Sequence, residues 1–225
     1  MDKKYELTDE TKKLNSITLH RIRALRNFDD VEEGELGGWI EEENNLSHKG
    51  NCWVYGDAMV FDNAEVYDNA IVSEHALVYR NAKVYNNAMI EDHAKIINSI
   101  ICDNAIVSEY AEVYSNPKVY GNARVSGNAE IYKNVEIFGD SIINGKTKIY
   151  GNGYITSNDD YFTIGPIGSR EDYITFYLDK DRNIWVSCGC FNNTIDKFKE
   201  YTIELYKSSK QCLNAIDFIK STLVQ

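Results

Sequence analysis

The sequence has little proline, few cysteines and no long apolar run: its 225 residues include 2 prolines and 5 cysteines. No stretch approaches the length needed to span a membrane, and the start, MDKKYELTDE, lacks the apolar core of a signal peptide. The cysteines are scattered and odd in number, which favours reduced thiols over a disulfide framework. We therefore expect a cytoplasmic protein with no membrane partner.

An excess of positive charge is also missing. The formal net charge is -11, whereas a general nucleic-acid-binding protein needs a basic surface. The composition thus predicts no direct nucleic-acid partner. An acidic surface could instead imitate nucleic acid toward a basic protein, and this alternative stays open.

A six-residue repeat occupies the stretch from Gly50 to Ser157. β-branched residues stand at eighteen positions six apart, interrupted by a single five-residue step from Ile96 to Ile101, and a small residue, most often alanine, comes two before each. Because side chains alternate along a strand, both members of each pair point inward. Three strand-turn units make one triangular coil, so the repeat predicts about six coils stacked roughly 4.8 Å apart.

The corners of these coils support the same register. Asparagine fills most positions of two edges, where it can adopt left-handed backbone and hydrogen-bond to its stacked neighbour. The five-residue step preserves these columns, so we interpret it as a shortened corner. The third edge differs, and its residues are Asp57, His75, His93, Tyr110, Asn128 and Lys146.

The repeat resembles the hexapeptide motif of left-handed parallel β-helices, in which a small residue follows an aliphatic one four places later, as Ala64 follows Val60. The resemblance covers about half of the chain and implies the left-handed form. The wider layout, with GELGGWIEEENNLS before GNCWVYGDA and with TIGPIGSR and VSCGCF behind, is similar to uncharacterised proteins of bacteriophages and prophages. That similarity implies a phage-related role inside a bacterial host cell.

We therefore predict a mainly β protein: a left-handed parallel β-helix of about six triangular coils with a capping segment before it and a small α+β module after it. The expected boundaries are 1–49, 50–157 and 158–225. The cap should contain short strands at Tyr5–Leu7 and Thr18–Leu25 and should close the first coil. The module should contain a hairpin of Tyr173–Leu178 and Ile184–Cys188, followed by two helices after Thr194.

The outward side chains differ between the three faces. Two faces carry aromatic columns, whose members can stack from coil to coil and stabilise the sheet. The third face has an apolar column beside small polar residues, and such a patch seldom stays exposed. Another copy of the chain or the C-terminal module should cover it; we favour self-association, and the resemblance implies a trimer. The predicted interface consists of Trp53, Ile71, Met89, Ile106, Arg124 and Ile142.

Many left-handed β-helix proteins are acyltransferases that use a histidine base near a subunit boundary, so this resemblance raises the question of catalysis. His75 and His93 share one edge and could supply a base or a metal site. They occupy corner positions that hold Asn or Asp elsewhere, and no inserted loop interrupts the repeat. We therefore favour solvated corner residues and predict no catalytic residue, cofactor or metal site.

Four residues of the C-terminal module are candidate binding residues. Ser169 and Arg170 belong to a glycine-rich turn that could offer backbone N–H groups and a guanidinium to an anion. Cys188 and Cys190 flank Gly189, a spacing too short for a zinc knuckle, and no base stands near them in the sequence.

The sequence favours a non-enzymatic, phage-type binding or structural protein, in which an oligomeric β-helix presents its terminal modules to a partner. One alternative is a phage inhibitor of a host defence system, which would act as an acidic mimic or sequester a ligand and could bind a host bacterial protein. The other is an acyltransferase-like enzyme.

Overall fold

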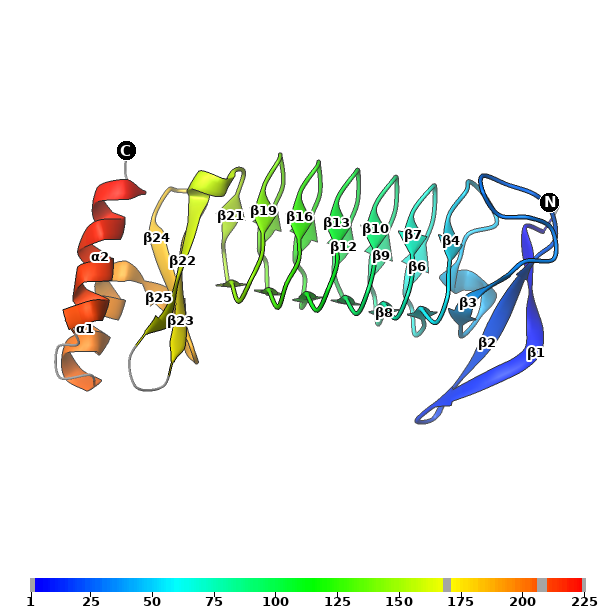
Figure 1. The fold of residues 1–225 in the computed structure, drawn as a ribbon, viewed down its shortest axis with the longest axis horizontal. Helices are drawn as coiled ribbons and strands as arrows, with labels where there is room; N and C mark the ends of the chain where they lie inside the picture. The colour runs from blue at the N-terminus through cyan, green and yellow to red at the C-terminus, as the bar shows by residue number, and fades with distance from the viewer. Residues whose placement is uncertain (1–2, 168–170, 206–209, 224–225) are drawn as a thin grey trace.

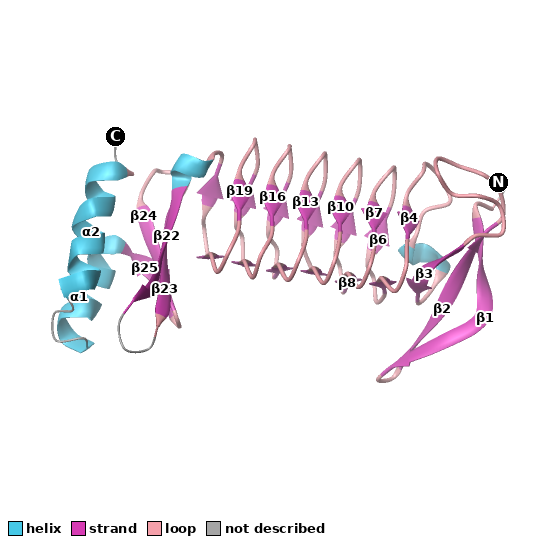
Figure 2. Ribbon diagram, in the orientation of Figure 1, coloured by secondary structure: helices cyan, strands magenta, loops and turns pink. Residues whose placement is uncertain are grey.

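The computed structural model describes residues 3–167, 171–205 and 210–223. The molecule is elongated: a hairpin lies at the N-terminal end, a stack of coils forms the middle, and two helices lie at the C-terminal end (Figure 1). Strands and turns dominate up to the last helices (Figure 2). The mainly β architecture predicted from the repeat is therefore confirmed.

Three parallel sheets form the solenoid, and each contains one short strand from each of six coils. The first sheet contains β5 (Met59–Val60), β8 (Leu77–Tyr79), β11 (Lys95–Ile97), β14 (Glu112–Tyr114), β17 (Glu130–Tyr132) and β20 (Lys148–Tyr150). The second contains β6 (Glu65–Val66), β9 (Lys83–Val84), β12 (Ile100–Ile101), β15 (Lys118–Val119), β18 (Glu136–Ile137) and β21 (Tyr154–Ile155). The third contains β4 (Trp53–Val54), β7 (Ile71–Val72), β10 (Met89–Ile90), β13 (Ile106–Val107), β16 (Arg124–Val125) and β19 (Ile142–Ile143).

The interior of the solenoid is a column of β-branched side chains. All eighteen repeat positions, from Val54 to Ile155, are at most 1% exposed, as are the alanines beside them. Each such Val or Ile contributes about 1.5 to 3 kcal/mol by leaving water, so the column supplies much of the folding free energy. Backbone hydrogen bonds join successive coils, such as the 2.8 Å bond from Tyr55 N to Val72 O.

The corners carry ladders of asparagine side chains. Asn81 Nδ2 donates to Asn98 Oδ1 at 3.1 Å on one edge, and Asn104 Nδ2 donates to Asn122 Oδ1 at 3.0 Å on another. At most corners the residue with positive φ stands one place before the ladder position, as Arg80 does with φ 60°. The expectation that the ladder asparagines themselves adopt the left-handed backbone is therefore wrong at most corners and holds at Asn98 and Asn116, with φ values of 51° and 85°.

A β-hairpin caps the first coil. It consists of β1 (Tyr5–Leu14) and β2 (Ile17–Ala24), and β3 (Leu36–Ile40) joins it to β5 of the first sheet; a short 3-10 helix, η1 (Glu43–Asn45), follows. The hairpin is longer than its apolar pattern predicts, because polar residues such as Thr11 and Lys13 still pair with β2 through their backbones.

Lys4 closes the end of the core from within this cap. Its ammonium is buried and donates to the carbonyl oxygen of Cys52 at 2.7 Å and to the Cys52 sulfur at 3.2 Å. Burial lowers the pKa of Lys4, although the nearby thiol opposes that shift. The amine thus satisfies backbone groups that the first coil cannot pair with a preceding coil.

The C-terminal module packs two helices on an antiparallel sheet. After the 3-10 helix η2 (Asn158–Asp160), the sheet runs in the order β22 (Tyr161–Ile167), β23 (Asp172–Leu178), β24 (Ile184–Cys188) and β25 (Phe191–Thr194). The helices are α1 (Ile195–Leu205) and α2 (Lys210–Thr222). The predicted hairpin and both helices are present, whereas the outer strands β22 and β25 were not predicted.

Candidate functional site

The predicted apolar column is a continuous row on the third sheet. Strand pairing aligns its members in order: Trp53, Ile71, Met89, Ile106, Arg124 and Ile142. Trp53 is fully buried within the chain, because the rings of Tyr5 and Phe28 lie 6.1 and 5.3 Å from it. The prediction that Trp53 faces another subunit is therefore corrected, and the accessible row begins at Ile71.

The rest of this row stays partly or fully open to solvent. Ile142 is 42% exposed, and Ile71, Met89 and Ile106 are partly exposed. The C-terminal module builds its apolar core from its own side chains. It reaches the row through Tyr161, whose hydroxyl donates to the carbonyl oxygen of Ile142 at 2.6 Å.

The third edge brings two histidines together. The rings of His75 and His93 lie 5.0 Å apart and nearly parallel, and Tyr110 continues the stack 4.9 Å beyond His93. All three residues are exposed. Parallel stacked imidazoles direct their nitrogen lone pairs side by side, so they do not converge on one metal ion. Within the described residues, no three His, Cys, Asp or Glu side chains form a group that could hold a metal.

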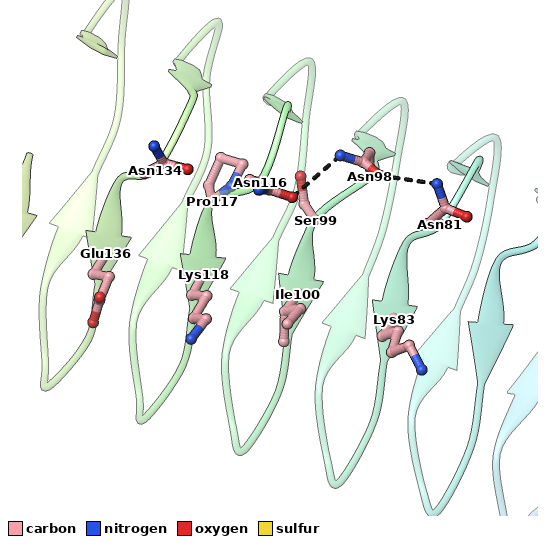
Figure 3. A pocket seen from close by; sticks show the side chains of 10 residues that line it. All are labelled: Asn81, Lys83, Asn98, Ser99, Ile100, Asn116, Pro117, Lys118, Asn134 and Glu136. Atoms are coloured by element: carbon pink, nitrogen blue, oxygen red, sulfur yellow. Dashed lines mark hydrogen bonds between the residues drawn. The ribbon is translucent and has the colours of Figure 1, made fainter. Parts of the chain in front are cut away.

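A groove runs along the edge between the first and second sheets, across the shortened corner (Figure 3). Its volume is about 470 Å³, and asparagines from successive coils line one side. Lys83 and Lys118 flank Ile100 along the other side, and Glu136 follows on the next coil. Sequence reasoning identified the shortened corner but not the groove that it helps to form.

The predicted residues of the C-terminal module are not brought together as a site. Ser169 and Arg170 lie outside the described residues. Cys188 is half-buried in β24, and Cys190 is exposed in the turn after Gly189, whose φ is 56°. All five cysteines are thiols.

The module contains an apolar groove that the sequence analysis missed. It lies between β22 and α2, has a volume of about 410 Å³, and includes Ile164, Ala215 and Phe218 in its lining. Phe218 is 53% exposed, and its ring lies 5.8 Å from that of Phe162. Phe162 and Ile164 alternate as in a strand, but the stretch is too short to have revealed β22 from the sequence.

In the part of the chain that the structure describes, no helix is long and apolar enough to cross a membrane. Comparison with known proteins gives two short similarities. A family model described as the YdcK beta solenoid repeat matches residues 118–133. A protein of Escherichia coli (strain K12), named as an uncharacterized acetyltransferase YdcK, is 47% identical over 47 residues, which cover 21% of this chain and 14% of that relative. Neither similarity supports the predicted phage-related role. Together with the fold, they identify the chain as a β-solenoid repeat protein.

Proposed function

We propose that this protein is a non-enzymatic binding or structural protein whose solenoid self-associates through its third sheet and presents its end modules to a partner. The observation that carries this proposal is the open apolar row of Ile71, Met89, Ile106 and Ile142. Ser73 and Ser108 are small residues beside it, whereas Glu91 lies between them and the exposed Arg124 interrupts the row before Ile142. Burying such a row between copies would remove apolar area from water.

The solution mass tests this proposal. We expect the wild-type chain to scatter light as an oligomer, a trimer by the resemblance, and Ile71→Lys plus Ile106→Lys to give a smaller particle. Ile97→Lys plus Ile100→Lys is the matched control, because it adds the same charge to the other two sheets. An unchanged mass in the first variant, or an equal loss in the control, would overturn the third-sheet interface.

A second candidate function is acyl transfer at the histidine edge. Two observations favour it: the exposed stack of His75 and His93, and the acetyltransferase named among the similar proteins. A neutral imidazole there could take a proton from an acceptor group. Turnover of acetyl-CoA in the presence of acceptor mixtures should then fall when both histidines are replaced by alanine, and should persist in Asn128→Ala on the same edge. Turnover that survives loss of both histidines would exclude this site.

A further inference from the structure

The groove across the shortened corner has an unusual local structure. Between β11 and β12 the chain has two residues, Asn98 and Ser99, whereas the preceding coil has three at the same corner. Ser99 is buried and donates to the carbonyl oxygens of Ile97 at 2.8 Å and Val113 at 3.1 Å. These bonds hold the Ser99 side chain inside the coil. The groove lies across this corner.

The asparagine ladder ends beside this groove. Its hydrogen bonds run from Asn63 through Asn81 and Asn98 to Asn116, and Figure 3 shows Asn134 standing apart from the ladder. Among the described residues, the side-chain NH2 group of Asn116 has no hydrogen-bond partner. Within the same part of the chain, neither the oxygen nor the NH2 group of the Asn134 side chain has one. Both residues are exposed, so these amides are available to a ligand.

The two lysines of the groove differ in their ion pairing. Lys83 pairs with Glu65 at 3.3 Å, but Lys118 has no ion-pair partner within the described residues. Glu136 accepts a 3.3 Å hydrogen bond from the Tyr120 hydroxyl. Together with Glu65, which pairs with Lys83, these groups are two lysines and two glutamates, and Lys118 supplies the ammonium that, among the described residues, is outside an ion pair. A ligand carboxylate can therefore bind at Lys118 without displacing a carboxylate of the protein.

The amides, the carboxylate and the apolar side chain of the groove favour some anionic ligands over others. Phosphate at neutral pH offers mainly acceptors, so the carboxylate of Glu136 and the amide oxygen of Asn134 would face it unfavourably. Hydroxyl groups donate and accept, and they match amides and carboxylates together. Ile100, between the two lysines, offers an apolar surface to the C–H face of a sugar ring. An extended peptide fits less well, because its side chains on one face repeat about every 6.8 Å, whereas the coils repeat about every 4.8 Å.

We propose that this groove binds an acidic saccharide, with a sugar carboxylate at Lys118 and ring hydroxyls at Asn116 and Asn134. The lining spans β9 to β18, which is three coil spacings or about 14 Å. That length suits two or three sugar residues. The site lies away from the apolar row of the third sheet, so it does not depend on self-association.

Calorimetric titration of the full chain with trigalacturonate tests the proposal, with galactotriose as the neutral control. We expect saturable binding of the acid and at least tenfold weaker binding of the neutral sugar. Lys118→Met should weaken binding about tenfold, as expected when one charge-assisted hydrogen bond is lost. Lys95→Met removes the same charge from the first sheet and should bind as the wild type does.

A second pair of variants measures the contribution of the asparagine amides to binding separately from that of the Lys118 charge. Asn134→Ala should weaken binding several-fold, while Asn152→Ala, at the same corner one coil on, should not. Neither side chain has a hydrogen-bond partner among the described residues, so both variants should fold. Absence of saturable binding to the wild type, equal losses in Lys118→Met and Lys95→Met, or full competition by inorganic phosphate would each overturn the proposal.

Discussion

A Cβ atom on Gly127 would lie 2.5 Å from the backbone nitrogen of Gly145, the residue stacked on it in the next coil. Both glycines have positive φ, at 71° and 66°. A Cβ on Gly145 meets no atom within 4 Å. The two positions therefore share a backbone requirement and differ in the space above them.

This difference predicts unequal costs for two alanine substitutions. Gly145→Ala should destabilise the protein by about 1 to 2 kcal/mol, because alanine is strained in left-handed backbone. Gly127→Ala should cost more, since the added methyl also meets the backbone of the next coil. Urea unfolding followed by circular dichroism measures both, and equal shifts of the midpoint would contradict the stacking of these corners.

Two neighbouring isoleucines of β11 test the direction of the side chains. Ile96 is fully buried in the solenoid, whereas Ile97 points outward and is partly exposed. We expect Ile96→Ala to reduce the free energy of unfolding by about 2 to 5 kcal/mol, because it leaves a cavity in a close-packed core. Ile97→Ala should cost less than half as much. A reversed order would mean that the strand register is wrong.

The repeat predicted most of the solenoid, for a physical reason. Every sixth residue must fit the same interior, so the pattern at Val60 and Ala64 is repeated along the whole stack and one interpretation satisfies all coils. The strand β22 offered no such repetition. Its residues Phe162 and Ile164 alternate over too short a stretch to separate a strand from a loop.

Functional features were harder to predict because they depend on departures from the repeat. Trp53 follows the pattern of the third sheet, but the cap covers it through Tyr5 and Phe28, which lie far away in the sequence. The groove at Lys118 depends on a missing residue and on the end of a hydrogen-bond ladder. Neither follows from side-chain periodicity.

The buried carboxylate of Asp160 should make the protein sensitive to acid. Burial opposes its charge, but hydrogen bonds from the Thr156 side chain and backbone, together with Arg182 at 2.5 Å, outweigh burial and hold the pKa of Asp160 below the ordinary 3.8. As the pH falls through this range, the unfolded state takes up the proton first, and the stabilisation is lost.

We therefore expect the free energy of unfolding to decline as the pH falls below about 4, and Asp160→Asn to show a shallower decline. At pH 7 the same variant should be less stable by about 1 to 3 kcal/mol, because the amide cannot satisfy the donors around it. Guanidinium unfolding at several pH values measures both effects. Parallel acid profiles for the variant and the wild type would show that other carboxylates dominate.

Tyr177 connects the C-terminal module to the solenoid. Its ionisation should make the free energy of unfolding fall at high pH. Its ring is fully buried, and its hydroxyl donates to the carbonyl oxygen of Tyr150 at 2.7 Å. Burial raises the pKa of Tyr177 to about 12, against an ordinary value of 10.0, although the hydrogen bond from Asn192 works in the other direction. Between these two pH values the unfolded chain releases this proton and the folded chain keeps it. The free energy of unfolding must therefore fall as the pH rises from 10 to 12.

Tyr177→Phe separates this effect from the loss of a hydrogen bond. The lost bond should cost about 1 kcal/mol at pH 8. The pKa values of Tyr85 and Tyr120 are also raised to about 12, and both tyrosines remain in the variant. The free energy of unfolding of the variant should therefore still fall with rising pH, but less steeply than that of the wild type. Urea unfolding at pH 8, 10 and 11 gives the slope for both proteins. If both proteins lose stability equally with rising pH, the Tyr177 phenol must reach water before the chain unfolds. The contact between Tyr177 and Tyr150 would then open locally, ahead of global unfolding.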